Sequence, residues 1–376
     1  MTLILEGKAI DPKNPANFPL DQFPWLEAVQ KFCTFWFSDE SSWQTNTSGS
    51  TSIPKTISLS RKLLEFSAQN SLNWFGFDPK TEGFALIIPA SSAGGFMLLA
   101  RAFMAGMDVL LLPPSTQIPS QEAFPSEKKW FVPMLPNQFN TFVHDENAPA
   151  CSRLFTGILL GGGPLETKAE VAMKMLECPV YHSYGMTETA SHIALRKIFP
   201  ADANPPFRSL EGIEIRLNKN DCLEIKASEI NNGEWLSSHD VAEIFEGNQF
   251  QIIGRADFVV NSGGLKIHPE IVRKLISAHL PPEINDFELL GCPDDILGEK
   301  LAMVIFTQKE ALKELVDPEN WFNAISNPAE RRTLPRSIYL MEDIRPILAG
   351  GKTDFMFLRK KIEEIVPVWE KPKTKE

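Results

Sequence analysis

Four short, mostly apolar runs are spaced along the first half of the chain, and helical patterns separate them. The runs are Phe84 to Ile88, Val109 to Leu112, Gly157 to Leu160 and Val180 to Ser183. Apolar runs of this length are typical of strands buried on both faces. Helical periodicity begins near Ser60, Gly95 and Glu166. Strands that alternate with helices predict an α/β fold with mostly parallel strands.

The pattern changes after about residue 205. Short segments from Ile213 to Leu217 and from Leu223 to Lys226 alternate as in an antiparallel β layer. Farther on, a strand pattern lies between two helical ones; these are Leu301 to Phe306, Pro269 to His279 and Phe355 to Ile365. We expect a large N-terminal α/β domain with a small β layer, residues 1–254, and a small mobile α+β C-terminal domain, residues 255–376.

Residues 1–46 are rich in aromatic residues and proline. Phe32, Phe35, Trp36 and Phe37 lie close together. This stretch predicts a loop followed by a short helix that packs its rings inward.

Composition narrows the function classes. The chain has 376 residues, with 37 basic and 48 acidic side chains and a net charge of −11. A protein held to nucleic acid by phosphate contacts would usually carry the opposite sign. The longest uncharged stretch, Gly83 to Ala100, is interrupted by proline and glycine, which disfavours a membrane span. We expect a cytoplasmic protein without a nucleic-acid partner or transmembrane segment, and a homo-oligomer stays open.

The segment from Thr47 to Lys55 suits a polyphosphate, because it combines five hydroxyl residues, a glycine and a terminal lysine. It also nearly matches the Walker pattern, but Pro54 stands where the second glycine is needed. A P-loop NTPase and a Ser/Thr-rich surface linker are therefore alternatives for this segment alone.

Three further motifs follow in order. Tyr184 to Glu188 comes directly after a predicted strand, where α/β folds place ligands. Gly254 to Asp257 precedes a double glycine, Gly263 and Gly264. Near the end, the segment from Pro346 to Lys352 places a second double glycine directly before the lysine, and a lysine on such a loop can reach into a distant cleft. Each motif alone also fits an ordinary turn or exposed loop.

Together the four motifs resemble those of the adenylate-forming superfamily, which includes acyl-CoA synthetases, peptide-synthetase adenylation domains and luciferases. The resemblance runs from about Thr47 to the C-terminus. The phosphate loop departs from the family pattern at Ser52, which replaces a glycine. Longer family members carry a further subdomain ahead of this loop, so the N-terminal domain is expected to be truncated there.

The resemblance implies an ATP site. Its expected residues are Thr47, Ser48, Gly49, Ser50, Thr51, Lys55, Gly162, Gly163, Tyr184, Gly185, Asp240 and Arg255. The hydroxyl loop would hold the β- and γ-phosphates, and the glycines would flank the adenine and acyl pockets. Tyr184 would stack on the base, while Asp240 and Arg255 would bind the ribose hydroxyls.

The resemblance also implies the catalytic parts. Thr187 would contact the α-phosphate, Glu188 would bind Mg²⁺, and Lys352 would bridge the acyl carboxylate and the α-phosphate. The acid would attack the α-phosphorus and expel pyrophosphate, a step that depends on positioning and charge neutralisation. The small domain would then swing about the hinge Asp257 and bring the Gly263–Gly264 loop to guide coenzyme A.

Details of the motifs look most like short bacterial o-succinylbenzoate–CoA ligases of menaquinone (vitamin K2) biosynthesis. Positions after the Thr-Glu pair, namely Ser191, His192 and Arg196, are candidates for the acyl pocket, with a surface location as the alternative for each. Other classes stay open: a ligase or adenylating enzyme for another aromatic or aliphatic acid, a P-loop NTPase, and a non-catalytic nucleotide-binding protein.

Overall fold

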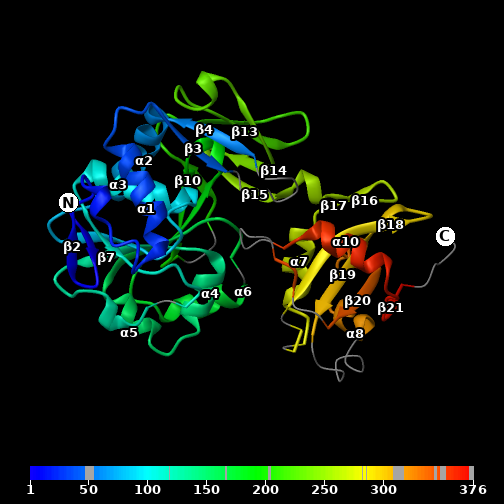
Figure 1. The fold of residues 1–376 in the computed structure, drawn as a ribbon. Helices are drawn as coiled ribbons and strands as arrows, with labels where there is room; N and C mark the ends of the chain where they lie inside the picture. Colours follow the sequence, from blue (N-terminus) through cyan, green and yellow to red (C-terminus); the bar gives the residue numbers. More distant parts are fainter. Residues whose placement is uncertain are drawn as a thin grey trace.

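The computed structural model describes residues 1–46, 55–117, 119–165, 167–201, 205–281, 283–284, 286–307, 317–342, 345–347 and 353–371. Two parts lie side by side in Figure 1, a larger one with the N-terminus and a smaller one with the C-terminus.

A mixed sheet runs through the larger part. Its strands are β1 (Leu3–Leu5), β2 (Lys8–Ile10), β5 (Glu82–Leu86), β6 (Asp108–Leu111), β7 (Lys129–Met134), β8 (Phe155–Leu160), β9 (Val180–Gly185), β10 (His192–Phe199), β11 (Phe207–Ser209), β12 (Glu214–Leu217), β13 (Cys222–Lys226), β14 (Leu236–Phe245) and β15 (Gln249–Arg255). The spatial order is β12-β13-β14-β15-β11-β10-β9-β8-β7-β5-β6-β1-β2.

The middle of this sheet is parallel, as the apolar runs predict. Strands β9, β8, β7, β5, β6 and β1 run in one direction, and β2 and β10 to β15 pair antiparallel. The α/β class is confirmed. The antiparallel strands are hydrogen-bonded edge to edge with the parallel ones, so the expected small β layer continues the same sheet.

Helices cover both sides of the parallel strands. One group is α1 (Glu27–Trp36), α2 (Arg61–Phe75) and α3 (Ala93–Ala105), and the other is α4 (Pro136–Val143), α5 (Ala148–Ser152) and α6 (Thr167–Ala172) (Figure 1). Helix α3 begins where the Ser92 hydroxyl accepts the N–H of Gly95, and it ends at Gly106, whose φ is 67°. Such caps satisfy terminal backbone groups and fix the helix bounds.

The aromatic N-terminal segment forms the predicted short helix, α1. The Phe32 ring centroid lies 5.7 Å from Phe96 of α3 and 5.2 Å from Trp43. The two preceding strands, β1 and β2, were not predicted, because three residues are too short to show a period. Leu3 and Leu5 are nevertheless buried, and β1 extends the parallel sheet beside β6.

The hydroxyl-rich segment connects two strands of a hairpin. Strand β3 (Ser42–Asn46) pairs antiparallel with β4 (Thr56–Ser60), with Asn46 opposite Thr56. Strand β3 was not predicted, because its polar sequence carries little apolar signal. A Walker loop leads from a strand into a helix, so the hairpin disfavours the P-loop NTPase alternative.

The smaller part has its own sheet. Its strands are β16 (Val260–Ser262), β17 (Leu265–Ile267), β18 (Phe287–Asp294), β19 (Gly298–Phe306), β20 (Ser337–Met341) and β21 (Trp369–Glu370). Its helices are α7 (Pro269–Ser277), α8 (Pro318–Asn323), α9 (Pro328–Arg331) and α10 (Phe355–Glu363). Short 3-10 helices complete the chain: η1 (Pro15–Asn17), η2 (Pro24–Leu26), η3 (Gln121–Ala123), η4 (Met173–Met175), η5 (Thr187–Thr189), η6 (Asn231–Gly233) and η7 (Ala256–Phe258).

Among the described residues, each buried apolar cluster has its members in one of the two parts only. The larger cluster has its buried members between Leu3 and Phe250, and the clusters of the smaller part begin at Val260. The domain boundary predicted after Gly254 lies in this interval and stays a prediction.

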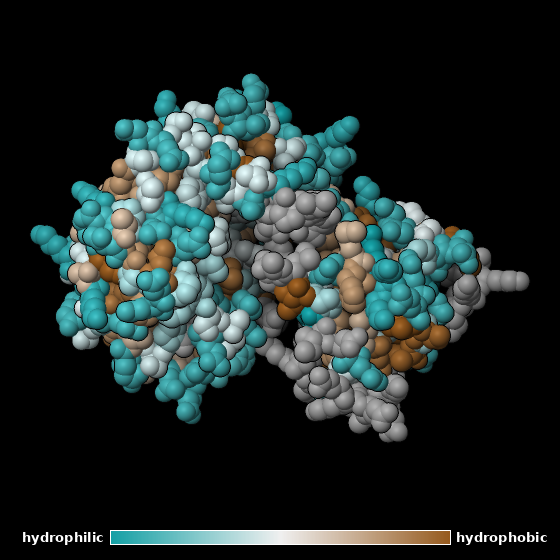
Figure 2. All heavy atoms as spheres, in the orientation of Figure 1, coloured by the Kyte–Doolittle hydropathy of each residue, from teal (hydrophilic) through white to brown (hydrophobic). Residues whose placement is uncertain are grey.

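The surface and the cysteines match the composition. Figure 2 shows a mostly hydrophilic face over the larger part. All five cysteines are buried free thiols. Within the described part of the chain, every helix is too short or too polar to cross a membrane.

Candidate functional site

The carboxyl ends of β8 and β9 bring two of the sequence motifs together. Leu160 lies opposite His182 in the parallel pair, so Gly161–Gly163 leave β8 at the same edge of the sheet where Tyr184 and Gly185 end β9. This edge is where parallel α/β sheets bind ligands. Helix η5 follows there and carries Thr187, which is partly buried, and Glu188, which is exposed.

Gly185 is required by a close backbone approach. A β-carbon at this position would lie 2.2 Å from the carbonyl oxygen of Ser191. The glycine therefore allows β9 to pass tightly against the start of β10.

Tyr184 is fixed by the antiparallel strands beside it. Its hydroxyl donates a hydrogen bond to Asp240 Oδ2 at 2.7 Å, and its ring lies edge-on to Phe250 with centroids 5.2 Å apart. Burial, and then the Asp240 charge, raise the pKa of the tyrosine well above its usual value. The phenol stays neutral, and its hydrogen bond and ring contact hold the side chain in place beside the carboxyl end of β9.

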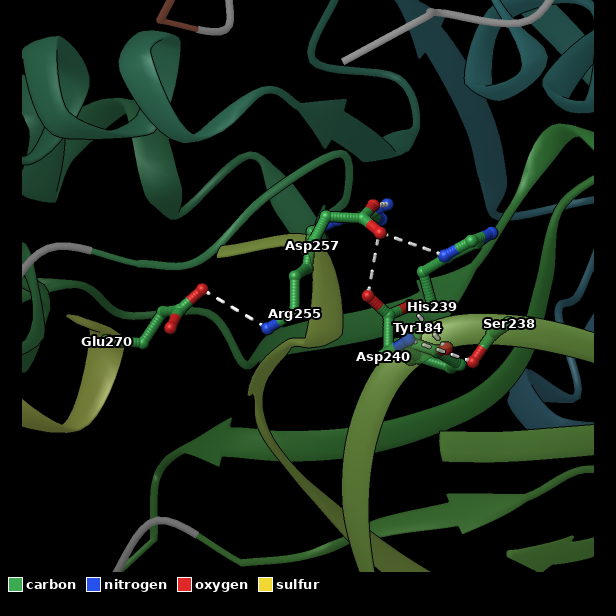
Figure 3. Close-up of polar contacts among 7 residues, drawn as sticks. All are labelled: Tyr184, Ser238, His239, Asp240, Arg255, Asp257 and Glu270. Carbon is green, nitrogen blue, oxygen red and sulfur yellow. Dashed lines mark hydrogen bonds and ion pairs between the residues drawn. The ribbon is translucent and has the colours of Figure 1, made fainter. Parts of the chain in front are cut away.

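Arg255 lies between two carboxylates (Figure 3). Its Nη1 is 3.4 Å from Asp240 Oδ1, and its Nη2 donates to Asp257 Oδ2 at 2.6 Å. The structure thus brings together the predicted nucleotide residues Tyr184, Asp240 and Arg255. Two carboxylates and one guanidinium offer acceptors and donors suited to ribose hydroxyls.

Asp257 has further partners next to the predicted hinge. His239 Nδ1 lies 2.9 Å from Asp257 Oδ1 (Figure 3). Glu270 Oε1 accepts the N–H of Arg255 at 3.3 Å, and a β-carbon on Gly254 would lie 2.5 Å from Glu270 Oε2. Burial raises the pKa of Glu270. His239 and Glu270 were not predicted as site residues; their place beside Arg255 and Asp257 is visible only in the fold.

Ser191 and His192 lie together around a residue that sequence reasoning missed. Arg101 of α3 donates from Nη2 to Ser191 Oγ at 2.8 Å, and the same nitrogen is 3.4 Å from His192 Nδ1. His192 Nε2 is 2.8 Å from Ser71 Oγ. The signal for Arg101 was available, since it is the one charged residue between Gly95 and Ala105.

The guanidinium of Arg101 is buried, with 5% exposed surface. Burial lowers its pKa to about 9, and it also lowers the pKa of His192 well below the usual value, so the arginine carries the charge at neutral pH. Among the described residues no carboxylate forms an ion pair with Arg101, and its Nε has no hydrogen-bond partner. A buried, uncompensated charge is costly unless an anion meets it.

Arg196 faces a different group of residues. It donates from Nη2 to His182 Nδ1 at 2.9 Å and does not join Ser191 and His192. Of the three residues predicted for the acyl pocket, His192 is buried, and Ser191 and Arg196 are partly buried.

Gly263 and Gly264 form the two-residue turn of the β16–β17 hairpin. Their φ angles are +58° and +84°, and Ser262 lies opposite Leu265. Positive φ at both positions is typical of a type I′ turn and favours glycine. The turn is exposed. Its role toward coenzyme A stays a prediction.

Some predicted residues lie outside the described ones: Thr47, Ser48, Gly49, Ser50, Thr51 and Lys352. Their flanks are described. Lys55 is exposed at the start of β4, and Ile347 bridges to Thr353 around the segment that contains Lys352.

Comparison with known proteins agrees with this geometry. Residues 45–227 match the AMP-binding enzyme family. The chain is 23% identical over 350 residues to a 2-succinylbenzoate–CoA ligase of Bacillus cereus, covering 85% of this chain and 70% of that one. Over residues 45–227 the chain is therefore similar to AMP-binding enzymes.

Solved structures have the same fold. An acyl-CoA synthetase (AMP-forming)/AMP-acid ligase II-like protein of Dyadobacter fermentans is 29% identical, with a TM-score of 0.58 over 94% of this chain and 99% of that one. The o-succinylbenzoate CoA synthetase of Bacillus subtilis, in complex with its acyl-adenylate, is 20% identical, with a TM-score of 0.71 over 86% and 69%. The family match and the curated relative make this chain similar to AMP-forming acid–CoA ligases, and the solved structures show the shared fold.

Proposed function

We propose that this ligase acts on o-succinylbenzoate, with ATP and coenzyme A as co-substrates, to form o-succinylbenzoyl-CoA, AMP and pyrophosphate. The observation that carries the proposal is Arg101. Its buried guanidinium lies against Ser191 and lacks a carboxylate partner among the described residues.

A diacid fits this charge. Adenylation consumes one carboxylate of o-succinylbenzoate and leaves the other as an anion. A buried arginine recognises a carboxylate with charge-assisted hydrogen bonds, often two at once. Ser191 and Arg101 would supply these donors to the carboxylate that does not react. A simple aliphatic acid would leave the arginine charge unpaired.

The remaining residues suit the adenylation half-reaction. A carboxylate oxygen of the acid bonds to the α-phosphorus of ATP as the bond to pyrophosphate breaks. Thr187, Lys55 and Lys352 would stabilise the charge on the phosphates, and Tyr184, Asp240 and Arg255 would hold the adenosine. In the second half-reaction the thiol of coenzyme A attacks the acyl carbonyl and AMP leaves.

Magnesium fits the acidic residue at this edge. Glu188 is exposed there, and no group of three metal-ligating side chains occurs among the residues that the structure describes. Mg²⁺ commonly takes one or two carboxylates and completes its shell with phosphate oxygens and water. Glu188 would therefore hold the ion together with ATP, and the ion would neutralise phosphate charge.

Names of relatives support the same acid. The ligases of Bacillus cereus and the synthetase of Bacillus subtilis are named for succinylbenzoate. At 20–24% identity, the choice of substrate rests on the arginine as much as on these names.

The direct test is pyrophosphate exchange into ATP driven by a panel of acids. The panel contains o-succinylbenzoate, its two analogues that each lack one carboxylate, benzoate, and fatty acids of several lengths. We expect the diacid to give the highest exchange rate and, with coenzyme A added, a thioester of the expected mass.

A preference for another acid by more than about tenfold in kcat/KM would overturn the choice of substrate and leave the acid–CoA ligase intact. Exchange with no thioester from coenzyme A would instead indicate transfer to a carrier protein. ADP formation would contradict adenylation altogether.

A further inference from the structure

Arg196 of β10 reaches the neighbouring strand β9 at one residue. Its Nη2 donates to His182 Nδ1 at 2.9 Å, and its Nη1 donates to the carbonyl of Pro205 at 3.3 Å. The guanidinium carbon lies 4.3 Å from the centre of the Phe207 ring. Burial lowers the pKa of Arg196 to about 10, so the side chain remains charged at neutral pH.

This contact sets the tautomer of His182. An arginine can only donate hydrogen bonds, so Nδ1 of His182 must carry the lone pair. The proton of the neutral ring is then on Nε2, which lies 3.0 Å from the carbonyl oxygen of Gly163 and donates to it. Burial and the Arg196 charge lower the pKa of His182 to about 4, which keeps the ring neutral.

His182 is the second of two consecutive anchors on the glycine segment. Ser183 Oγ donates to the carbonyl of Leu160 at 2.7 Å, just before the segment. Within it, Gly162 has a φ of +90°, a conformation that an L side chain rarely adopts. The glycines contribute no side chains, so their peptides depend on such contacts from β9 for a fixed orientation.

We propose that Arg196 is a positioning residue for the adenine subsite: it fixes the Nε2–H tautomer of His182, which holds the Gly163 carbonyl in place. The proposal rests on the proposed function in one respect, the placement of Gly162 and Gly163 beside the adenine. It assigns Arg196 to nucleotide binding, whereas sequence position had suggested the acyl pocket.

The first test observes the tautomer directly. Long-range ¹H–¹⁵N correlation spectra of ¹⁵N-histidine-labelled protein separate protonated from unprotonated ring nitrogens, and the variant His182→Asn assigns the signal. We expect Nε2 to be protonated in the wild type and in Arg196→Lys, which keeps a donor. In Arg196→Met both tautomers should be populated. A wild-type His182 protonated at Nδ1 would overturn the proposal.

The second test measures nucleotide affinity. Titration with MgATP needs no acid, so a wrong choice of acid substrate does not affect it. We expect Arg196→Met to weaken binding about tenfold, the equivalent of about one charged hydrogen bond, and Arg196→Lys to restore most of the affinity. Arg208→Met is the matched control, because Arg208 is exposed on the adjacent strand β11.

A comparison of the KM for ATP with the KM for the acid separates a positioning role of Arg196 from general damage to the fold. In pyrophosphate exchange, Arg196→Met should raise the KM for ATP and leave the KM for the acid within about twofold. Equal increases in both KM values, or an Arg196→Lys variant as weak as Arg196→Met, would indicate a merely structural residue and contradict the proposal.

Discussion

At the residue scale, the proposal of a diacid substrate rests on Arg101. It is buried in α3, contacts Ser191, and has no carboxylate partner among the described residues. Burying such a cation without a counter-ion is costly, and a carboxylate of the substrate would offset that cost. This is a stronger constraint on the substrate than any single motif in the sequence.

We therefore expect Arg101→Met to abolish the preference for the diacid. Its kcat/KM for o-succinylbenzoate should fall about 30- to 100-fold, the range of one or two charged hydrogen bonds. The monoacid analogue that still reacts should lose less than about threefold, and it serves as the control. Equal losses with both acids would show that Arg101 only supports the fold.

A second residue-scale prediction concerns pH. The pKa of His182 is lowered from 6.5 to about 4, first by burial and then by Arg196. Between these values the unfolded chain binds a proton that the folded chain does not, so stability falls as the pH is lowered through this window. From about pH 7 to about pH 5 the His182 share is about 2 kcal/mol.

Urea unfolding at several pH values measures this effect. His192 acts in the same direction, because its pKa is also lowered by burial. The variant His182→Asn should therefore lose only part of the pH dependence. An unchanged pH dependence in that variant would contradict a neutral buried His182.

At the scale of elements, hydrophobic pattern predicted four of the parallel strands and the β12–β13 pair, and it missed β7 in the centre of the sheet as well as β1 and β3. Strands β5, β6, β8 and β9 follow from short apolar runs, and helices α2 and α3 follow from helical periods. Strand β3, with the sequence Ser-Trp-Gln-Thr-Asn, is stabilised by pairing with β4 and shows no apolar run. Such strands depend on contacts distant in sequence, which a local pattern does not contain.

The residues of the candidate site also fall into those that the sequence predicted and those that only the fold brings in. The Tyr184, Asp240 and Arg255 contacts join three motifs that the resemblance had placed in one site. Arg101 and Ser71 carry no motif, and they meet Ser191 and His192 only because α2 and α3 pack on the sheet. Arg196 was selected for its position in the sequence, but the pairing of β9 with β10 directs it toward His182.

The close approach of the end of β9 to the start of β10 gives a prediction at the scale of elements. In Gly185→Ala the new β-carbon would lie 2.2 Å from the Ser191 carbonyl, so the strands must separate. We expect a loss of about 1–3 kcal/mol in the free energy of unfolding, measured by urea denaturation. Gly163→Ala is the control for stability, because its β-carbon would lie 3.7 Å from Pro136. Equal stabilities of the two variants would contradict the close approach.

At the scale of the whole molecule, the question is whether the two parts alternate between half-reactions. In sequence, Lys352 lies between β20 and α10 of the smaller part, and the residues proposed for adenylation at the β8–β9 edge belong to the larger one. The resemblance leads us to expect that Lys352 and the Gly263–Gly264 turn reach the acyl group in two different arrangements.

We expect Lys352→Ala to reduce adenylation at least about 100-fold, because it removes a cation from the transition state. Thioester formation from supplied acyl-adenylate should fall less than about threefold. Lys360→Ala, an exposed position on α10, is the control and should change neither rate. If both half-reactions fell together, alternation about Asp257 would be wrong for this protein.

The central claim, an acyl-adenylate route from o-succinylbenzoate to its CoA thioester, is tested most directly by oxygen transfer. The protein is incubated with ATP, Mg²⁺, coenzyme A and o-succinylbenzoate labelled with ¹⁸O in its carboxylates, and the products are analysed by mass spectrometry. The account predicts thioester and AMP in equal amounts, with one ¹⁸O from the acid in each AMP. Unlabelled AMP, or ADP in its place, would contradict it.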